Sequence, residues 1–199
     1  INGPQVAPVA PAGAVAHWGF DETSGLTAID SAGGHNGTLA GFDGDDSQWV
    51  DGHVGGALRI NGDNDGELVN AVGYKGIGGT QARTTAAWIK TTDTDGTIVS
   101  WGKNTGGQKW VFRTQTGNGP NGAIRTEVNG GYLVGETIVA DGDWHHVAMV
   151  LPNGANNVSQ MLVYIDGLLE PHSNTLGKGI NTASGNDVQI GVGFGGQKF

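Results

Sequence analysis

The sequence contains no cysteine, few basic residues and no long apolar run. Without cysteine, disulfide bonds and thiolate metal sites are excluded. No apolar run approaches the ~20 residues that a transmembrane helix needs, so insertion into a membrane is not expected. Lys and Arg number 10 against 19 Asp and Glu, which gives a net charge of −9, and no basic cluster is visible. This acidic balance argues against nucleic acid and anionic membrane surfaces as partners.

Helical periodicity is also missing from the sequence. No segment keeps apolar residues at a 3.6-residue period over three turns, so we expect almost no helix. Instead, short runs of alternating apolar and polar residues are separated by Gly, Asn and Asp, which favour turns. The clearest runs are 15–20, 56–60, 84–91, 96–101, 109–114, 123–128, 145–151, 160–165 and 187–192. This series predicts an all-β fold, either a sandwich or a barrel.

Two local signals refine the expected organisation. Residues 1–14 hold three of the six prolines, which predicts an extended arm or linker ahead of one domain at 15–199. Asp166-Gly167, between two apolar runs, predicts a hairpin with a type I′ turn, because both residues tolerate positive φ. The 38 glycines show no three-residue period, which excludes a collagen-like chain.

Four stretches carry the pattern of a known family. They begin "AHWGFDETSG" in 16–41, "GHVGGALRI" in 52–69, "TTAAWIKT" in 84–102 and "DGDWHHVAMV" in 141–170. In this order they resemble the laminin G-like jelly rolls of the concanavalin A-like lectin/glucanase superfamily. The resemblance implies a two-sheet antiparallel jelly-roll sandwich, often with a structural calcium ion, that binds glycans or proteins outside the cell. Because one fold hosts many functions, it does not define the ligand.

The end of the chain departs from the family pattern. Such domains finish with a strand of the type Gly-x-Ile-Asp-Glu-Val-x-Ile, and the sequence stops at 190–199, where that strand would begin. A sheet that lacks its last strand exposes a row of unpaired backbone N–H and C=O groups. Either the sequence is cut before this strand, or a neighbouring chain or domain completes the open edge.

The adjacent His145 and His146 raise the question of a metal or catalytic pair. Neighbouring side chains of a strand point to opposite faces, so both imidazoles cannot reach one ion without a bulge. We expect one histidine to pack in the core and the other to lie near the surface. Trp18, Trp88 and Trp144 lie inside the strongest strand patterns, and we assign them to the core.

Aspartate-rich loops favour calcium, which prefers six to eight hard oxygen ligands. Three loops supply such oxygens: Asp21, Asp30 and Asn36 in the first, which the resemblance favours, Asp93 and Asp95 in the second, and 61–68 in the third. The alternative for each loop is a turn in which the Asp or Asn side chain bonds its own backbone without a metal.

Catalysis is not expected from the carboxylates. Glycoside hydrolysis needs two carboxyl groups that face each other across the scissile bond. The resemblance implies that glucanases of the superfamily place them as Glu-x-Asp-x-x-Glu on one strand. None of the five glutamates has that spacing: Glu22, Glu67, Glu127, Glu136 and Glu170. A glycoside hydrolase or lyase is therefore disfavoured.

Aromatic and polar residues for sugar binding gather between positions 101 and 132. Aromatic rings stack on sugar rings, while arginines bond hydroxyls. The candidate ligand-binding residues are Trp101, Trp110, Arg113, Arg125 and Tyr132. If the two runs pair in one sheet, Arg113 and Arg125 can share a polar face with Glu127. In the alternative, Trp110 fills the core and the arginines form salt bridges across the sheet.

Two functions follow from these observations. The leading hypothesis is a non-catalytic module, extracellular or at the cell surface, that is stabilised by calcium and binds a glycan or a glycosylated surface. The alternative is a structural or assembly domain of a larger surface protein, joined to its neighbours through the open sheet edge and the arm at 1–14.

Overall fold

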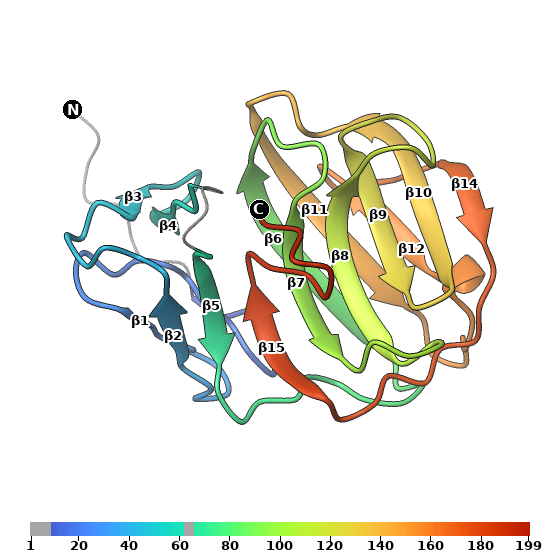
Figure 1. Ribbon diagram of the computed structural model, residues 1–199, viewed down its shortest axis with the longest axis horizontal. Coiled ribbons are helices and arrows are strands. Elements are labelled where there is room, and N and C mark those ends of the chain that lie inside the picture. Colours follow the sequence, from blue (N-terminus) through green and yellow to red (C-terminus); the bar gives the residue numbers. More distant parts are fainter. Residues whose placement is uncertain (1–8, 62–65) are drawn as a thin grey trace. The chain divides into compact units, whose positions relative to one another are not determined.

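The computed structural model describes residues 9–61 and 66–199 (Figure 1). Part of the predicted arm, residues 1–8, and half of the predicted third calcium loop, residues 62–65, lie outside the described residues. The fold is all β, as predicted: the described residues contain fifteen strands and one short 3₁₀ turn, η1 (Val158–Gln160). No helix in this part of the chain is long and apolar enough to cross a membrane.

The chain divides into two compact units, residues 1–74 and 75–199. The first unit contains an antiparallel sheet in the order β1-β2-β5 and a hairpin β3-β4. Its strands are β1 (Thr27–Ala28), β2 (Gly37–Ala40), β3 (Trp49–Asp51), β4 (Gly56–Leu58) and β5 (Leu68–Ala71). Gly37 has no room for a side chain, because a Cβ atom there would lie 2.2 Å from Cγ1 of Val69.

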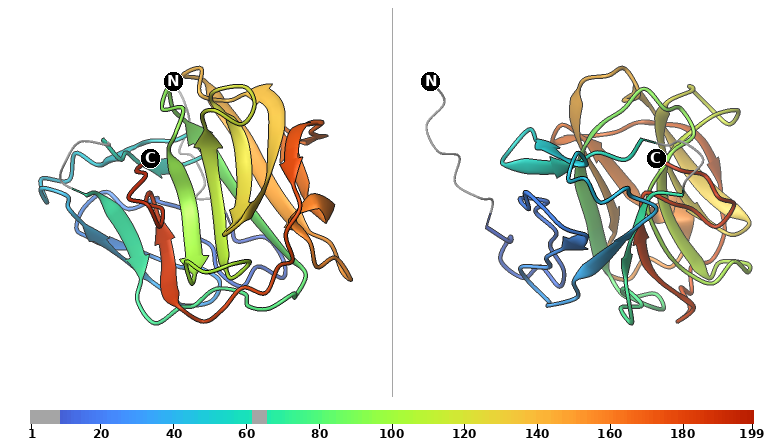
Figure 2. Two further views of the ribbon diagram at one scale, coloured as in Figure 1. Left: turned by 45° about the vertical axis from the view of Figure 1, so that its right-hand side comes forward. Right: turned by 60° about the vertical axis from the view of Figure 1, so that its left-hand side comes forward.

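The second unit is a sandwich of two antiparallel sheets (Figures 1 and 2). One sheet has six strands in the order β15-β7-β8-β9-β10-β14, and the other has four in the order β13-β12-β11-β6. The six-stranded sheet comprises β7 (Thr97–Gly102), β8 (Lys109–Gln115), β9 (Ala123–Val128), β10 (Gly131–Ile138), β14 (His172–Leu176) and β15 (Asn186–Ile190). The four-stranded sheet comprises β6 (Arg83–Lys90), β11 (Trp144–Leu151), β12 (Leu162–Ile165) and β13 (Leu168–Leu169).

The core of the second unit lies between these two sheets. Trp110, Phe112 and Leu133 of the six-stranded sheet are fully buried, as is Met149 of the four-stranded sheet. Trp110 Nε1 donates a hydrogen bond to Thr85 Oγ1 of β6 at 3.2 Å, which joins the two layers. Because strand side chains alternate, the residues between these core positions point to the outer face of the six-stranded sheet.

A buried arginine closes one end of this core. The Arg83 guanidinium donates to the carbonyl oxygens of Ile77 and Gly78 and to Thr182 Oγ1, and its Cζ lies 4.0 Å above the Trp110 ring. Burial lowers the pKa of Arg83 to about 10, because the charged form loses its hydration. The side chain thus ties the 77–79 segment to residue 182 and to the core.

Most predicted strand positions are confirmed, and one is wrong. The run at 15–20 contains only an isolated bridge between Trp18 and Asp30. Phe20 has φ 57°, and the His17 N–H donates to the Asp30 side chain rather than to a neighbouring strand. The predicted turn at Asp166-Gly167 is confirmed, with φ 52° and 82°.

The assignment of Trp88 to the core is wrong. Its neighbour Ile89 is buried against the core, so strand alternation turns Trp88 to the outer face of the four-stranded sheet, where 43% of it is exposed. There it pairs with His146, and the two rings lie edge to face at 5.3 Å. Trp18 and Trp144, also assigned to the core, are half-buried.

Candidate ligand-binding face

The outer face of β8, β9 and β10 carries a group of polar side chains. Antiparallel pairing places Arg113 beside Arg125 and places Tyr132 beside Glu127. The prediction that both arginines share one sheet face with Glu127 is therefore confirmed. Lys109 begins β8 on this same face, because it lies four residues before Arg113 in a strand with a two-residue period.

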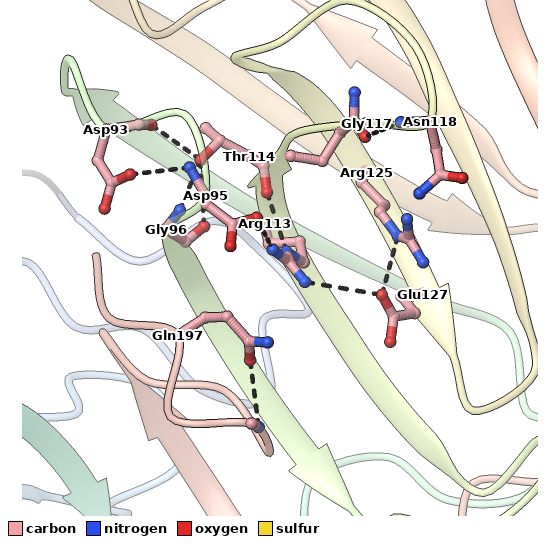
Figure 3. A network of polar contacts seen from close by, with 12 residues as sticks. Asp93, Asp95, Gly96, Arg113, Thr114, Gly117, Asn118, Arg125, Glu127 and Gln197 are labelled. Atoms are coloured by element: carbon pink, nitrogen blue, oxygen red, sulfur yellow. Dashed lines mark hydrogen bonds and ion pairs between the residues drawn. The ribbon is translucent and has the colours of Figure 1, made fainter.

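Glu127 is the centre of this group. Lys109 Nζ lies 2.5 Å from Oε1 of Glu127, and Arg125 Nε lies 2.8 Å from Oε2. Arg113 Nη1 is 3.8 Å from the same Oε2. All four side chains are only 10–14% exposed, so water screens these attractions less than it would at an open surface. Figure 3 shows the two arginines converging on the carboxylate.

A loop at one end of β8 holds Arg113 from the other side. Arg113 forms an ion pair with Asp95 and donates from Nε to the Thr114 carbonyl at 2.9 Å. The Thr114 hydroxyl in turn donates to the Asp93 carbonyl at 2.9 Å and accepts from the Gly96 N–H at 2.8 Å (Figure 3). These bonds fix the 91–96 turn, and with it the orientation of Arg113.

Tyr132 adds an aromatic ring to this face. The Arg125 guanidinium lies over the ring, with its Cζ 4.1 Å from the centroid. The Tyr132 hydroxyl donates to Asn118 Oδ1 at 3.1 Å and accepts from Asn174 Nδ2 at 3.5 Å. Gln115 holds Asn118 in place, because its Oε1 accepts from the Asn118 N–H at 3.1 Å. The candidate site thus draws on β8, β9, β10, β14 and the 116–121 loop.

The last nine residues border the same face. The Ser100 hydroxyl on β7 donates to the Val192 carbonyl at 2.7 Å, and the Phe194 ring centroid lies 5.7 Å from Lys109 Nζ. Within the segment, Gly195 N–H donates to Gln197 Oε1 at 3.1 Å (Figure 3). The segment therefore brings an aromatic ring and an amide to the edge of the polar group.

Two predicted ligand-binding residues lie away from this face. Trp110 is fully buried and Trp101 is 5% exposed, and both rings point into the core. Trp101 Nε1 donates to the Ile77 carbonyl at 3.1 Å, so its polar atom is satisfied inside the protein. Neither ring offers a face to a sugar in this structure, and the core alternative for Trp110 describes its position.

The first predicted calcium loop is organised by Asp30. Its carboxylate accepts hydrogen bonds from the backbone N–H groups of His17, Ala32, Gly33 and His35 at 2.8–3.0 Å. Burial opposes the charge on this carboxylate, but the four donors outweigh it and hold the pKa of Asp30 well below its usual range. These donors direct positive hydrogens toward the carboxylate oxygens.

The other predicted ligands of that loop also bond the backbone. Asn36 Oδ1 accepts from the Asp30 N–H at 3.0 Å, while Asp21 Oδ1 accepts from the Gly56 N–H at 2.8 Å. Asp30 and Asn36 are thus brought together, whereas Asp21 is bound to a different segment. The bonds of Asp30 and Asn36 match the turn named as the alternative, while calcium binding at this loop stays a prediction.

The second predicted loop brings Asp93 and Asp95 together in a similar turn. Asp93 Oδ1 accepts from the Asp95 N–H at 2.8 Å, and Asp95 pairs with Arg113. Across residues 9–61 and 66–199, the structure contains no group of three or more His, Asp or Glu side chains that could hold a metal ion. Calcium binding stays a prediction.

The predicted separation of the two histidines is confirmed by the faces of β11. His145 shares its face with the buried Val147, and His146 lies opposite Trp88 on the outer face. His145 Nδ1 lies 2.8 Å from Asp166 Oδ2, and its Nε2 lies 3.3 Å from the Asp141 carboxylate. Burial opposes the charge of the imidazole, but these two carboxylates outweigh it and raise the pKa of His145.

The Glu170 carboxylate is hydrogen-bonded to the end of β10. Its Oε1 accepts from the backbone N–H groups of Glu136 and Thr137, at 2.7 and 2.5 Å, and its Oε2 accepts from the Thr137 hydroxyl at 3.0 Å. The carboxylate therefore fixes the bulged end of β10, near Gly135, where a Cβ atom would lie 2.8 Å from the Glu170 side chain. It is not aimed at the outer face that carries Glu127.

Lys109, Asn118 and Asn174 belong to the candidate site but were not among the predicted residues. Lys109 could have been predicted from the sequence, because it lies four residues before Arg113 in the same strand and therefore faces the same side. Asn118 and Asn174 could not have been predicted, because a loop and a strand distant in the sequence bring them to the Tyr132 hydroxyl.

The geometry of the second unit is that of a lectin-type jelly roll, with a packed core between two antiparallel sheets. The model of a laminin G family, described as the concanavalin A-like lectin/glucanases superfamily, matches residues 61–199. The chain belongs to this superfamily. A search of curated proteins found no match.

A solved structure of a similar domain shows the same fold. The chain is similar to domain 4 of AbnA, a GH43 extracellular arabinanase from Geobacillus stearothermophilus, solved in complex with arabinotriose. The TM-score is 0.62 at 21% identity, over 89% of this chain and 82% of that chain. Domains LG4-5 of the mouse laminin alpha1 chain match with a TM-score of 0.44 at 14% identity, over 63% of this chain and 31% of that chain.

Proposed function

We propose that this chain is a non-catalytic carbohydrate-binding module that acts outside the cell. The observation that carries the proposal is the outer face of β8, β9 and β10, where Arg113, Arg125, Glu127 and Tyr132 form one connected group. Guanidinium, carboxylate and phenol groups supply the donors and acceptors that sugar hydroxyls require. The amides of Asn118 and Asn174 adjoin them.

The rigidity of the group supports a binding role. Each arginine is held by an acidic partner or an aromatic ring before any ligand arrives. Side chains that are already ordered lose less conformational entropy on binding, so more of the contact energy is expressed as affinity. The similarity in fold to a domain solved with arabinotriose agrees with this assignment, as does the extracellular arabinanase to which that domain belongs.

The carboxylates support a non-catalytic role. Glu127 is shared by three cationic side chains, and Glu170 is bonded to the backbone at the end of β10. Hydrolysis requires two carboxyl groups that face each other across a sugar linkage. On the proposed binding face, the carboxylates of Glu127 and Asp95 are each paired with a cation instead.

A glycan array that includes arabinotriose, followed by calorimetry on each hit, tests this proposal. We expect Tyr132→Ala to weaken binding by about tenfold, equivalent to ~1.4 kcal/mol, because the ring and its hydroxyl contacts are lost. Tyr164→Ala is the matched control, since Tyr164 lies on β12 in the other sheet. Absence of binding to every glycan, with and without calcium, would contradict the proposal and favour an assembly domain.

A further inference from the structure

The proposed binding face differs in charge from the protein as a whole. Lys109, Arg113 and Arg125 are three of the chain's 10 basic residues, and they meet there with two carboxylates, Glu127 and Asp95. Three cations against two carboxylates leave one net positive charge. The complete chain carries −9. A cationic spot in an acidic protein attracts an anionic group locally, while the rest of the surface does not favour polyanions.

Arg125 is the cation best placed to contact a ligand. Its Nε atom is buried and lies 2.8 Å from Glu127 Oε2 as an ion-pair contact without a hydrogen bond, and its Cζ lies 4.1 Å from the Tyr132 ring centroid. Among the described residues, no hydrogen-bond acceptor is bound to its two terminal nitrogens, Nη1 and Nη2. Unlike Nε, these nitrogens are not buried.

The other two cations, Arg113 and Lys109, already contact partners within the protein. Arg113 donates from Nη2 to Asp95 and from Nε to the Thr114 carbonyl, and its Nη1 faces Glu127. Lys109 has one short contact to Glu127. Arg125 therefore differs from its neighbours, since it presents two parallel donors in a fixed plane.

Resting on the function proposed above, we propose that the bound oligosaccharide is acidic, and that Arg125 binds the carboxylate of a uronic acid unit. Two terminal guanidinium nitrogens match the two oxygens of a carboxylate in a bidentate pair. Glu127 acts as a positioning residue, because its contact to Nε and the Tyr132 ring hold the guanidinium plane. Its own charge is shared among three cations, so it does not repel the incoming carboxylate strongly.

The test compares each acidic sugar with its neutral counterpart on the intact chain. The probes are the trisaccharides of galacturonate, mannuronate and glucuronate, each also prepared with its carboxyl groups reduced to alcohols, together with arabinotriose. Calorimetry is run at about 20 mM and about 500 mM NaCl, because salt screens charge interactions. We expect at least one acidic probe to bind about tenfold more tightly than its reduced form at low salt, with a smaller difference at high salt.

Variants assign this preference to Arg125. Arg125→Gln is expected to abolish the difference between acidic and reduced probes. Arg125→Lys keeps the charge but loses the planar fork, so about threefold preference should remain. Lys103→Gln changes the charge equally at an exposed position in the loop after β7 and should leave the preference intact.

The outcomes separate this inference from the proposed function. Equal binding of acidic and reduced probes would overturn the acidic ligand while leaving a carbohydrate-binding module in place. An unchanged preference in a folded Arg125→Gln or Arg125→Lys variant would overturn the role of Arg125. Failure of every probe, arabinotriose included, would overturn the acidic ligand, and absence of binding across the whole glycan array would overturn the proposed function as well.

Discussion

At the scale of single residues, a few carboxylates organise much of this protein. Glu127 forms ion pairs with three basic side chains, while Asp30 accepts hydrogen bonds from four backbone N–H groups. Both groups are largely withdrawn from water, where a charge without partners is costly. The surrounding donors therefore offset the cost of burying each carboxylate, and the donors are ordered in return.

Glu127→Gln tests this dependence. The neutral amide leaves Lys109, Arg113 and Arg125 close together without their shared anion, so we expect about 2 kcal/mol lower free energy of unfolding. Urea denaturation followed by tryptophan fluorescence gives the value. Glu136→Gln is the matched control, because Glu136 is exposed and its substitution should cost less than about 0.5 kcal/mol. Equal effects of the two variants would contradict the structural role of Glu127.

At the scale of elements, strand alternation explains which predictions succeeded. Arg113, Arg125 and Glu127 were placed on one face because a period of two is a local property of each strand. The core assignment of Trp88 was wrong, since alternation shows that Trp88 and Ile89 point apart but not which one meets the core. The prediction of a strand at 15–20 was wrong, because the His17 N–H donates to the Asp30 carboxylate instead of a neighbouring strand.

The stability that His145 contributes to the pair of strands β11 and β12 is expected to depend on pH. Both ring nitrogens of His145 face carboxylates, of Asp166 and Asp141, and only the protonated imidazolium donates to both. The pKa of His145 is raised above its ordinary value of 6.5. Its contribution to stability is therefore complete below about pH 6.5 and is lost as the pH rises through the folded-state pKa.

His145→Gln measures this contribution. We expect the wild type to exceed the variant in melting temperature by more at about pH 5.5 than at about pH 8.5. His172→Gln, at an exposed position on β14, is the control and should show no such dependence. A difference between wild type and His145→Gln that does not vary with pH would show that the imidazole contributes only by packing.

At the scale of the whole molecule, calcium binding stays a prediction for this member of the superfamily. The aspartate-rich loops predicted calcium, and the structure shows these aspartates bonded to the backbone or to Arg113. Carboxylate oxygens in such turns still have lone pairs for a cation. The loop at 91–96 is of most interest, because it adjoins the proposed binding face.

The melting temperature measured with and without calcium tests the calcium prediction. If calcium binds the native state, about 1 mM calcium chloride should raise the melting temperature relative to a chelator, because a ligand that binds only the folded state stabilises it. Magnesium at the same concentration is the control, since it rarely forms sites built from protein ligands alone. An identical melting temperature in calcium and in chelator would contradict the prediction.

The sequence by itself determined the all-β class, the hairpin at Asp166-Gly167 and the shared face of Arg125 and Glu127. These features follow from strand periodicity and turn preference, which act over a few neighbouring residues. Only the tertiary structure decided that Trp110 is buried and that Asn174 reaches Tyr132. Burial and long-range contact depend on what the opposite sheet or a distant segment presents, and no local pattern contains that information.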